Sequence, residues 1–335
     1  MSELLLTVLG IVMLTVVAVD VFMTVFSPSE YGGPVTLWLN RLIWAITRNV
    51  SRGRGGRHAH RTLALAAPIM AVTTILLWIM LLIAGFALIY LPWMDTFLVS
   101  PGRLRSPVVE AFYFSASTAT TLSIGDLVPN LAALRVLAPL ETLAGIGLLT
   151  AVLQYILAIS ERAQEMATTS LNIAVHFEGE HEPEAVAEKI RQPDDVSAWG
   201  SWCEQVSRHL LALWEAHTRY PILLYFHPPN PSEALSTQLA SLLHFRRAVL
   251  RPERNPLARH PGFLAMCRSL DLYLLAVDRH FLRGPAAGSD GVNDVERAYR
   301  RLVKQTGYAE SVQDRDLSDL QGGPEDQRLG SKRSA

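Results

Sequence analysis

Three long apolar runs constrain this 335-residue chain more than any other feature. The first extends from Leu4 to Phe26 and is interrupted only by Asp20. The second, residues 63–93, contains no charged residue, and the third, residues 136–159, contains one acid, Glu141. At 1.5 Å per residue each run can cross a hydrocarbon core of about 30 Å. We therefore predict three transmembrane helices.

The composition agrees with a membrane protein. Half of the residues are hydrophobic and 18% are charged, against about 25% charged in ordinary soluble proteins. A signal peptide is the alternative interpretation of the first run. A signal peptide begins with basic residues, whereas Glu3 and no Lys or Arg precedes this run, and the run is too long for the apolar part of such a peptide. The two cysteines exclude a disulfide-stapled secreted domain, and a net charge of -1 gives no reason to expect nucleic acid.

Basic residues predict the orientation. Six arginines and no acid lie between the first two runs: Arg41, Arg48, Arg52, Arg54, Arg57 and Arg61. We expect the protein to lie in the cell (plasma) membrane, where the positive-inside rule places this loop in the cytoplasm. The N-terminus is then outside, and everything after Ile159 is cytoplasmic. We interpret the cluster as this topology signal with anionic-lipid contact, rather than as a nucleic-acid or metal site. Asp20 would lie near the cytoplasmic end of its span and snorkel or pair with loop arginines.

A short apolar segment lies between the second and third runs. Ser106 suits an N-cap and Pro107 a first helical position. A helix from Pro107 to about Thr120 would be about 20 Å long and would stop partway across the membrane. Its C-terminal carbonyls carry partial negative charge and would favour a cation there. A polar turn with a glycine, an acid and a proline follows, which predicts a re-entrant pore loop.

This loop resembles a known family. Residues 120–126, Thr-Thr-Leu-Ser-Ile-Gly-Asp, resemble the Thr-Thr-Val-Gly-Tyr-Gly-Asp filter of tetrameric potassium channels. Phe112-Tyr113-Phe114-Ser115 before it and Leu127-Val128-Pro129 after it fit the same pattern, and Arg135 followed by Ala144-Gly145-Ile146 is similar to the inner helix of bacterial two-transmembrane potassium channels. The resemblance covers about residues 63–159.

The resemblance implies a fold and an activity. It implies a homotetramer that conducts K⁺ or another monovalent cation, with the first span packed outside the outer helix. The implied filter residues are Thr120, Thr121, Leu122, Ser123, Ile124, Gly125 and Asp126.

Two filter positions depart from the family pattern. Glycine is expected at position 123, because alternate filter residues take left-handed backbone angles that turn every carbonyl inward. A serine in that geometry costs about 1–2 kcal/mol per subunit. Ile124 replaces a tyrosine whose hydroxyl can tether the filter. We therefore expect weakened potassium selectivity.

The third run carries candidate gating residues. Glu141 either bonds pore-helix hydroxyls such as Thr118 or Thr120, lines the water-filled cavity, or is a protonated acid satisfied within the bundle. Pro139 should loosen the helix. The resemblance makes Gly145, with Gly147, the gating hinge, and plain helix packing is the alternative role of such small residues.

The C-terminal half has a soluble composition. Val206, Leu210, Leu213, Trp214 and His217 recur at helical spacing, and Cys267, Leu270, Leu274, Val277 and Phe281 follow a similar rhythm. We expect a small all-α cytoplasmic domain and a disordered tail rich in Asp, Gly, Ser and Gln. The acidic stretch containing His176, Glu178, Glu180, His181, Glu182 and Glu184 matches no established metal pattern, so we expect a solvated linker and no metal.

The predicted fold class is an all-α membrane protein with three transmembrane helices, a re-entrant pore helix and filter loop, and an α-helical cytoplasmic domain. The predicted regions are an N-terminal transmembrane helix (1–30), a basic loop (31–62), a pore domain (63–160), a cytoplasmic helical domain (161–305) and a tail (306–335). We expect a homotetrameric cation channel in a lipid bilayer, without a cofactor and without enzymatic activity. The alternative is a non-conducting membrane sensor or scaffold with a vestigial pore and a helical domain that binds an unknown cytoplasmic partner.

Overall fold

The computed structural model describes residues 2–26, 32–52, 63–99, 106–177, 183–226, 228, 234–251, 255–279 and 291–306. The regular structure of these residues is helical apart from two strands of two residues each. The chain divides into two compact units, one of residues 1–45 and 68–160 and the other of residues 46–67 and 161–335.

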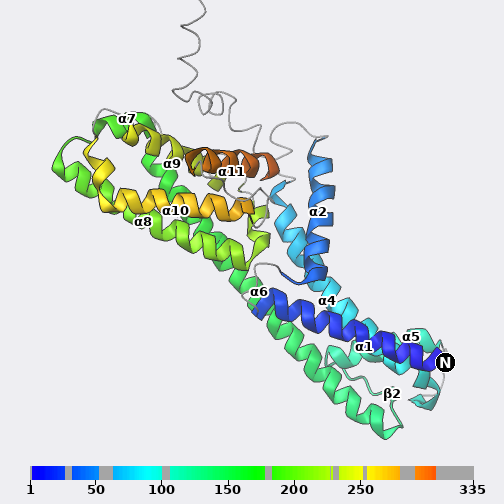
Figure 1. Ribbon diagram of the computed structural model, residues 1–335. Coiled ribbons are helices and arrows are strands. Elements are labelled where there is room, and N and C mark those ends of the chain that lie inside the picture. The colour runs from blue at the N-terminus through cyan, green and yellow to red at the C-terminus, as the bar shows by residue number, and fades with distance from the viewer. Residues whose placement is uncertain are drawn as a thin grey trace, which may run out of the picture. The chain divides into compact units, whose positions relative to one another are not determined.

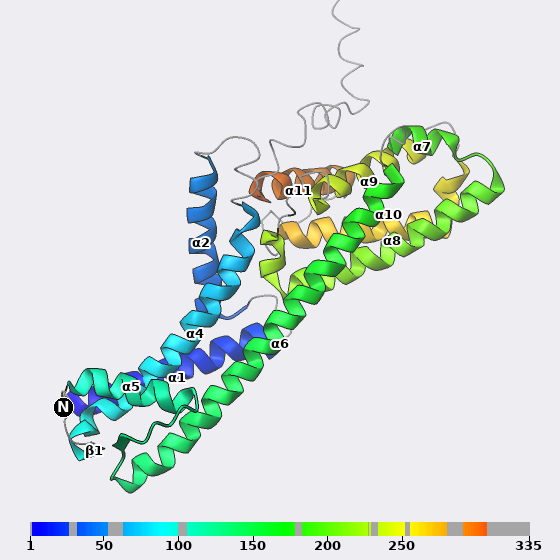
Figure 2. The same cartoon turned by 180° about the vertical axis from the view of Figure 1, so that it is seen from behind.

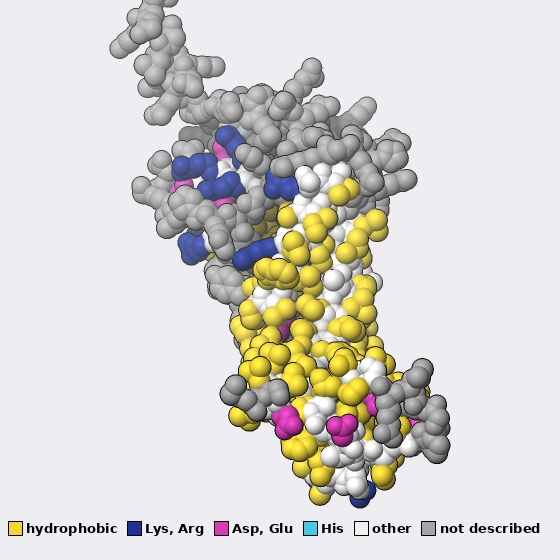
Figure 3. Space-filling model, turned by 90° about the vertical axis from the view of Figure 1, so that its right-hand side faces the viewer, with side chains coloured by type: hydrophobic (Ala, Val, Ile, Leu, Met, Phe, Trp, Pro, Cys, Tyr) yellow, Lys and Arg dark blue, Asp and Glu magenta, His cyan; other side chains and the backbone are white. Residues whose placement is uncertain are grey.

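The first unit contains the membrane spans, and we call it the membrane unit. Three helical stretches are long and apolar enough to cross a bilayer: α1 (Ser2–Val21) continued by η1 (Phe22–Phe26), α4 (Ala66–Tyr90) continued by η2 (Leu91–Thr96), and α6 (Ala132–Phe177). The predicted all-α membrane protein is therefore confirmed (Figure 1). The 46 residues of α6 measure about 70 Å at 1.5 Å per residue, so the helix is longer than a bilayer core. Hydrophobic side chains cover most of the visible face of the membrane unit (Figure 3).

Close glycine contact holds α1 against α4. A Cβ added to Gly10 would lie 2.5 Å from the carbonyl oxygen of Gly85, so only glycine allows this approach. Small residues at a crossing let two spanning helices come close together. The first span packs against the helix that precedes the pore helix, as the resemblance implied.

Asp20 differs from the sequence expectation. It is fully buried, and its carboxylate accepts hydrogen bonds from the Val35 amide (2.8 Å), the Thr36 hydroxyl (2.6 Å) and the Trp78 indole (2.8 Å). The carboxylate therefore caps the first turn of α2 (Pro34–Arg52) and joins it to α4. The prediction that Asp20 snorkels or pairs with loop arginines is wrong, because these donors satisfy the acid inside the protein.

A helix is present where the sequence predicts the pore helix, and the name is kept for it below. α5 (Pro107–Ala119) begins after Ser106, whose side chain makes no capping bond to the described residues. After α5 the chain returns through β2 (Leu127–Val128), which pairs antiparallel with β1 (Leu98–Val99). α5 and this strand pair lie at the same end of the membrane unit (Figures 1 and 2). The segment between α5 and β2 is thereby held at both of its ends.

The second unit is a helical domain, which we call the helical unit. Its elements are α7 (Pro183–Lys189), α8 (Pro193–Arg219), η3 (Pro221–Tyr225), α9 (Leu235–Leu250), η5 (Pro256–Arg259), α10 (Pro261–Val277) and α11 (Gly291–Thr306). α8 and α10 form its centre, because a Cβ on Gly262 would lie 2.1 Å from the Gly200 carbonyl oxygen and Ser207 bonds Ser269 at 2.7 Å. The helical spacing predicted for residues 206–217 is confirmed, although Trp214 is exposed. Phe281 and residues 307–335 lie outside the described residues.

Candidate functional site

The segment after the pore helix has an unusual backbone. Thr121, Ser123 and Gly125 have positive φ angles of 61°, 40° and 80°. Positive φ costs a residue with a side chain about 1–2 kcal/mol. Every second residue therefore has the left-handed geometry that the resemblance implied, and Ser123 keeps it despite its Cβ.

Hydrogen bonds to the end of α5 orient the first peptides of this segment. The amides of Leu122 and Ser123 both donate to the Ser117 carbonyl oxygen, at 2.8 and 3.3 Å. The described peptide bonds are trans, and a trans peptide directs its C=O opposite to its N–H. The carbonyls of Thr121 and Leu122 therefore both point away from the pore helix. Two successive carbonyls directed to one side are what a carbonyl filter requires.

The other end of the segment is anchored separately. The Tyr113 hydroxyl, from α5, donates to the Asp126 carboxylate at 3.1 Å. Beyond β2, the Arg135 side chain donates to the Pro129 carbonyl at 2.9 Å. The sequence suggested that Ile124 removes a hydroxyl tether of the filter. In the structure Tyr113 provides such a tether from the pore helix.

Glu141 connects α6 to the pore helix. It is fully buried, and its Oε1 accepts a hydrogen bond from the Ser115 hydroxyl at 2.5 Å. The same hydroxyl lies 2.9 Å from the Ile83 carbonyl oxygen of α4, and the Tyr90 hydroxyl faces the carboxyl group. Of the three roles considered for Glu141, this contact corresponds to the first, because the acid bonds a hydroxyl of the pore helix. The hydroxyl belongs to Ser115, however, and not to Thr118 or Thr120.

Two further contacts join α6 to the C-terminal end of α5. The Thr142 hydroxyl lies 3.2 Å from the Thr118 carbonyl oxygen, and a Cβ on Gly145 would lie 2.1 Å from the Ala119 carbonyl oxygen. Gly145 is therefore a close-packing residue. Among the described residues no atom lies within 4 Å of a Cβ built on Gly147. The two glycines assigned to one hinge thus have different surroundings.

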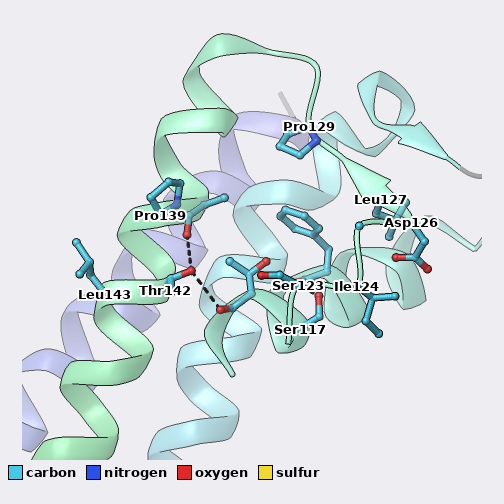
Figure 4. Close-up of a pocket in the computed structure, with 13 residues that line it drawn as sticks. Ser117, Ser123, Ile124, Asp126, Leu127, Pro129, Pro139, Thr142 and Leu143 are labelled. Carbon is cyan, nitrogen blue, oxygen red and sulfur yellow. Dashed lines mark hydrogen bonds between the residues drawn. The ribbon is translucent and has the colours of Figure 1, made fainter. Parts of the chain in front are cut away.

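A cavity of about 590 Å³ lies between α5, the filter segment and α6. Ser123, Ile124 and Asp126 line it from the filter side, and Pro139 and Thr142 from α6 (Figure 4). Two large apolar side chains that line it, Ile124 and Leu143, are exposed in the single chain. Exposed apolar side chains of this kind are typical of a surface that contacts lipid or another protein.

Sequence reasoning gave no role to Tyr113 or Ser115. The available signal was helical spacing, since Ala111, Ser115 and Thr118 recur at i, i+4 and i+7 and share one face of α5. That face meets α6, and an acid in the third run was the natural partner for a hydroxyl on it.

The acidic stretch after α6 provides no metal site in the described part of the chain. No group of three or more His, Cys, Asp and Glu residues there is arranged to hold a metal ion. His176 stacks on Trp202 with ring centroids 4.7 Å apart, and Glu184 accepts a hydrogen bond from His244 at 3.0 Å. The other proposed members, residues 178–182, lie outside the described residues.

Comparison with known proteins agrees with this geometry. Residues 74–162 match a family model described as "Ion channel". The matched stretch includes most of α4, all of α5, the filter segment and the first two thirds of α6. The predicted resemblance is confirmed for this part of the chain, which is similar to an ion channel domain.

A relative in Bacillus subtilis (strain 168), described as "Uncharacterized membrane protein YdjJ", is 23% identical over 233 residues. The match covers 70% of this chain and 66% of the relative, slightly less than two thirds of its length. No solved structure matches the chain.

Proposed function

We propose that the protein is a homotetrameric channel for monovalent cations, with K⁺ as the main permeant ion and with weakened selectivity. The observation that carries this proposal is the pair of Thr121 and Leu122 carbonyls that point away from the pore helix. Carbonyl oxygens arranged in this way can replace the hydration shell of a cation. The negative end of the α5 dipole adds a favourable potential at the same level.

A homotetramer supplies what one chain lacks. One chain contributes one filter segment, whereas a closed ring of carbonyls needs several around an axis. Ile124 and Leu143, which line the cavity, are exposed in the single chain, and a neighbouring copy would cover them. Cyclic symmetry is the common solution for such repeated interfaces.

Topology enters the proposal through the arginines between the first two spans. With Arg41 and Arg48 on the cytoplasmic side of the plasma membrane, the pore helix enters from outside and the helical unit lies in the cytoplasm. The filter segment then lies on the extracellular side of the membrane.

The test is ion flux in proteoliposomes that contain the purified full-length protein. We expect K⁺ to move down its gradient, with Na⁺ passing to a measurable extent. The variant Ser123→Gly/Ile124→Tyr should raise the K⁺/Na⁺ permeability ratio, because it removes the Cβ at a left-handed position and restores the family's tyrosine. An unchanged ratio would contradict the carbonyl argument.

Gly125→Ala provides a sharper filter variant. Gly125 has a φ of 80°, and a Cβ there would meet no atom of the described chain within 4 Å. Within one subunit, a loss of flux would then come from the backbone angle and not from a steric clash. Trp214→Gln, on the exposed surface of α8, is the control that should conduct normally.

The second candidate is a non-conducting sensor or scaffold with a vestigial pore. The strained Ser123 (φ 40°) in place of glycine favours it. It predicts no flux of any monovalent cation, no effect of filter variants on a cellular phenotype, and loss of that phenotype when residues 161–335 are deleted.

A further inference from the structure

Helix α2 exposes a long apolar face. Trp38, Leu42, Ile46 and Val50 follow one another at four-residue spacing and are 63%, 43%, 56% and 42% exposed. Residues four apart lie on one side of a helix. The face therefore forms a strip along the whole of α2.

The opposite side of the helix is committed to the protein interior. Thr36, Asn40 and Thr47 are buried, and these positions lie away from the apolar strip on the helical wheel. The helix is therefore already packed on one side, and its exposed strip is the side that faces out.

Arginines border the strip along one edge. Arg41 is exposed and Arg48 follows it seven residues later, two turns along the same side. The sequence of α2 contains no Asp or Glu. An apolar strip with a tryptophan, bordered by arginines and free of acids, is typical of a helix that lies at the surface of an anionic bilayer.

The first turn of α2 is fixed at the edge of the membrane. Asp20 binds the Val35 amide and the Thr36 hydroxyl, and Asp20 lies 17 residues beyond Glu3 in the first span. Seventeen residues of helix measure about 26 Å, close to the full depth of a hydrocarbon core of about 30 Å. The Trp78 indole, from the second span, holds the carboxylate at the same level. The strip therefore begins where acyl chains meet headgroups.

We propose that α2 is a membrane-surface helix whose apolar strip enters the bilayer interface while Arg41 binds anionic lipid headgroups. Asp20 sets the depth of its first turn. The partner is the anionic lipid surface itself, because α2 is joined at its first turn to the first span and its charged edge is complementary to that surface. The proposal depends on the membrane spans and is independent of ion conduction.

The test is hydrogen–deuterium exchange of the full-length protein in nanodiscs of phosphatidylcholine alone and of phosphatidylcholine mixed with phosphatidylglycerol. We expect slower exchange of residues 34–52 in the mixed nanodiscs, and loss of that difference in high salt, which screens the headgroup charge. Arg41→Gln should reduce the extra protection by about fivefold, which corresponds to one arginine near an anionic surface. Arg208→Gln, at an exposed salt bridge on α8, is the matched control and should have no effect on α2.

The apolar strip is tested by Trp38→Gln/Leu42→Gln, which should accelerate exchange of α2 in both kinds of nanodisc. Leu211→Gln/Trp214→Gln removes a similarly exposed Leu and Trp from α8 and is its control. Should the strip variant fail to fold, the unmodified protein in bilayers that contain a diazirine-bearing phosphatidylglycerol should crosslink through α2. Exchange of α2 that is the same in both lipids and in detergent, or crosslinks that avoid α2, would overturn the proposal and indicate a protein partner for the strip.

Discussion

Gly145 and Gly147 lie two residues apart on α6 and are predicted to respond differently to alanine. At Gly145 a Cβ would lie 2.1 Å from the Ala119 carbonyl oxygen, whereas an ordinary contact is 3.4 Å or more. The inner helix and the pore helix would therefore have to separate by more than 1 Å at this level. Overpacking of this kind costs about 1–3 kcal/mol.

The same substitution at Gly147 meets open space in the subunit, since no described atom lies within 4 Å of the added Cβ. Alanine is the better helix former by up to about 1 kcal/mol. The gain in helix propensity applies at both positions, so the two variants differ by the cost of overpacking alone. We therefore expect Gly147→Ala to be neutral or stabilising, and Gly145→Ala to be less stable than Gly147→Ala by about 1–3 kcal/mol.

The assay combines thermal unfolding of the purified protein with K⁺ flux in proteoliposomes. Gly145→Ala should lower the unfolding temperature by several degrees relative to Gly147→Ala. It should also alter flux, because separation of the helices lengthens the contact between Thr142 and the Thr118 carbonyl, now 3.2 Å. Equal unfolding temperatures and equal flux in the two variants would refute the close-packing role of Gly145.

Three other predictions follow from single contacts. Tyr113→Phe removes the 3.1 Å hydrogen bond to Asp126, and the loss of about 1 kcal/mol of stabilisation should loosen the outer end of the filter. We expect a lower K⁺/Na⁺ permeability ratio; an unchanged ratio would mean that this hydrogen bond does not affect selectivity. Asp20→Asn keeps the shape but removes the charge that accepts from the Trp78 indole; thermal unfolding should show a loss of about 1.5–3 kcal/mol, and full stability would contradict the capping role. In the helical unit, burial lowers the pKa of His217 from 6.5 to about 4, so between these pH values the unfolded chain binds a proton that the folded chain does not. Stability should therefore fall as the pH falls, by about 2 kcal/mol at pH 5, and His217→Gln should remove this part of the pH dependence measured by denaturant unfolding.

Local patterns in the sequence predicted the helices well. The spans follow from runs of apolar residues, and the pore helix follows from Pro107 and from a length too short to span, so its observed end at Ala119 differs by one residue from the prediction. These features depend on neighbouring residues alone. The resemblance implied left-handed geometry at alternate filter residues and therefore a glycine at position 123. That Ser123 keeps this geometry could not be predicted from the local composition.

The partners of the two intramembrane acids were not predictable in the same way. Asp20 bonds Trp78, 58 residues away, and Glu141 bonds Ser115, 26 residues away. Each pairing depends on how far one helix slides along another, and that register is set by contacts such as Gly10 against Gly85. An acid in an apolar run predicts that a polar partner exists, but the register of the helices decides which one.

The contacts of α6 also bear on where a gate can bend. α6 is one helix from Ala132 to Phe177 with Pro139 inside it, so neither proline nor glycine breaks it in this state. The pore helix holds α6 at Glu141, Thr142 and Gly145. A bend at or before Gly145 would pull on these contacts and disturb the end of α5 that binds the filter amides. A bend beyond Gly145, at Gly147 or later, would move the rest of α6 and leave the filter support in place. An inner helix that opens without disturbing its filter must therefore pivot after Gly145, and the glycine assigned to the hinge by resemblance acts here as the point where the two helices are joined.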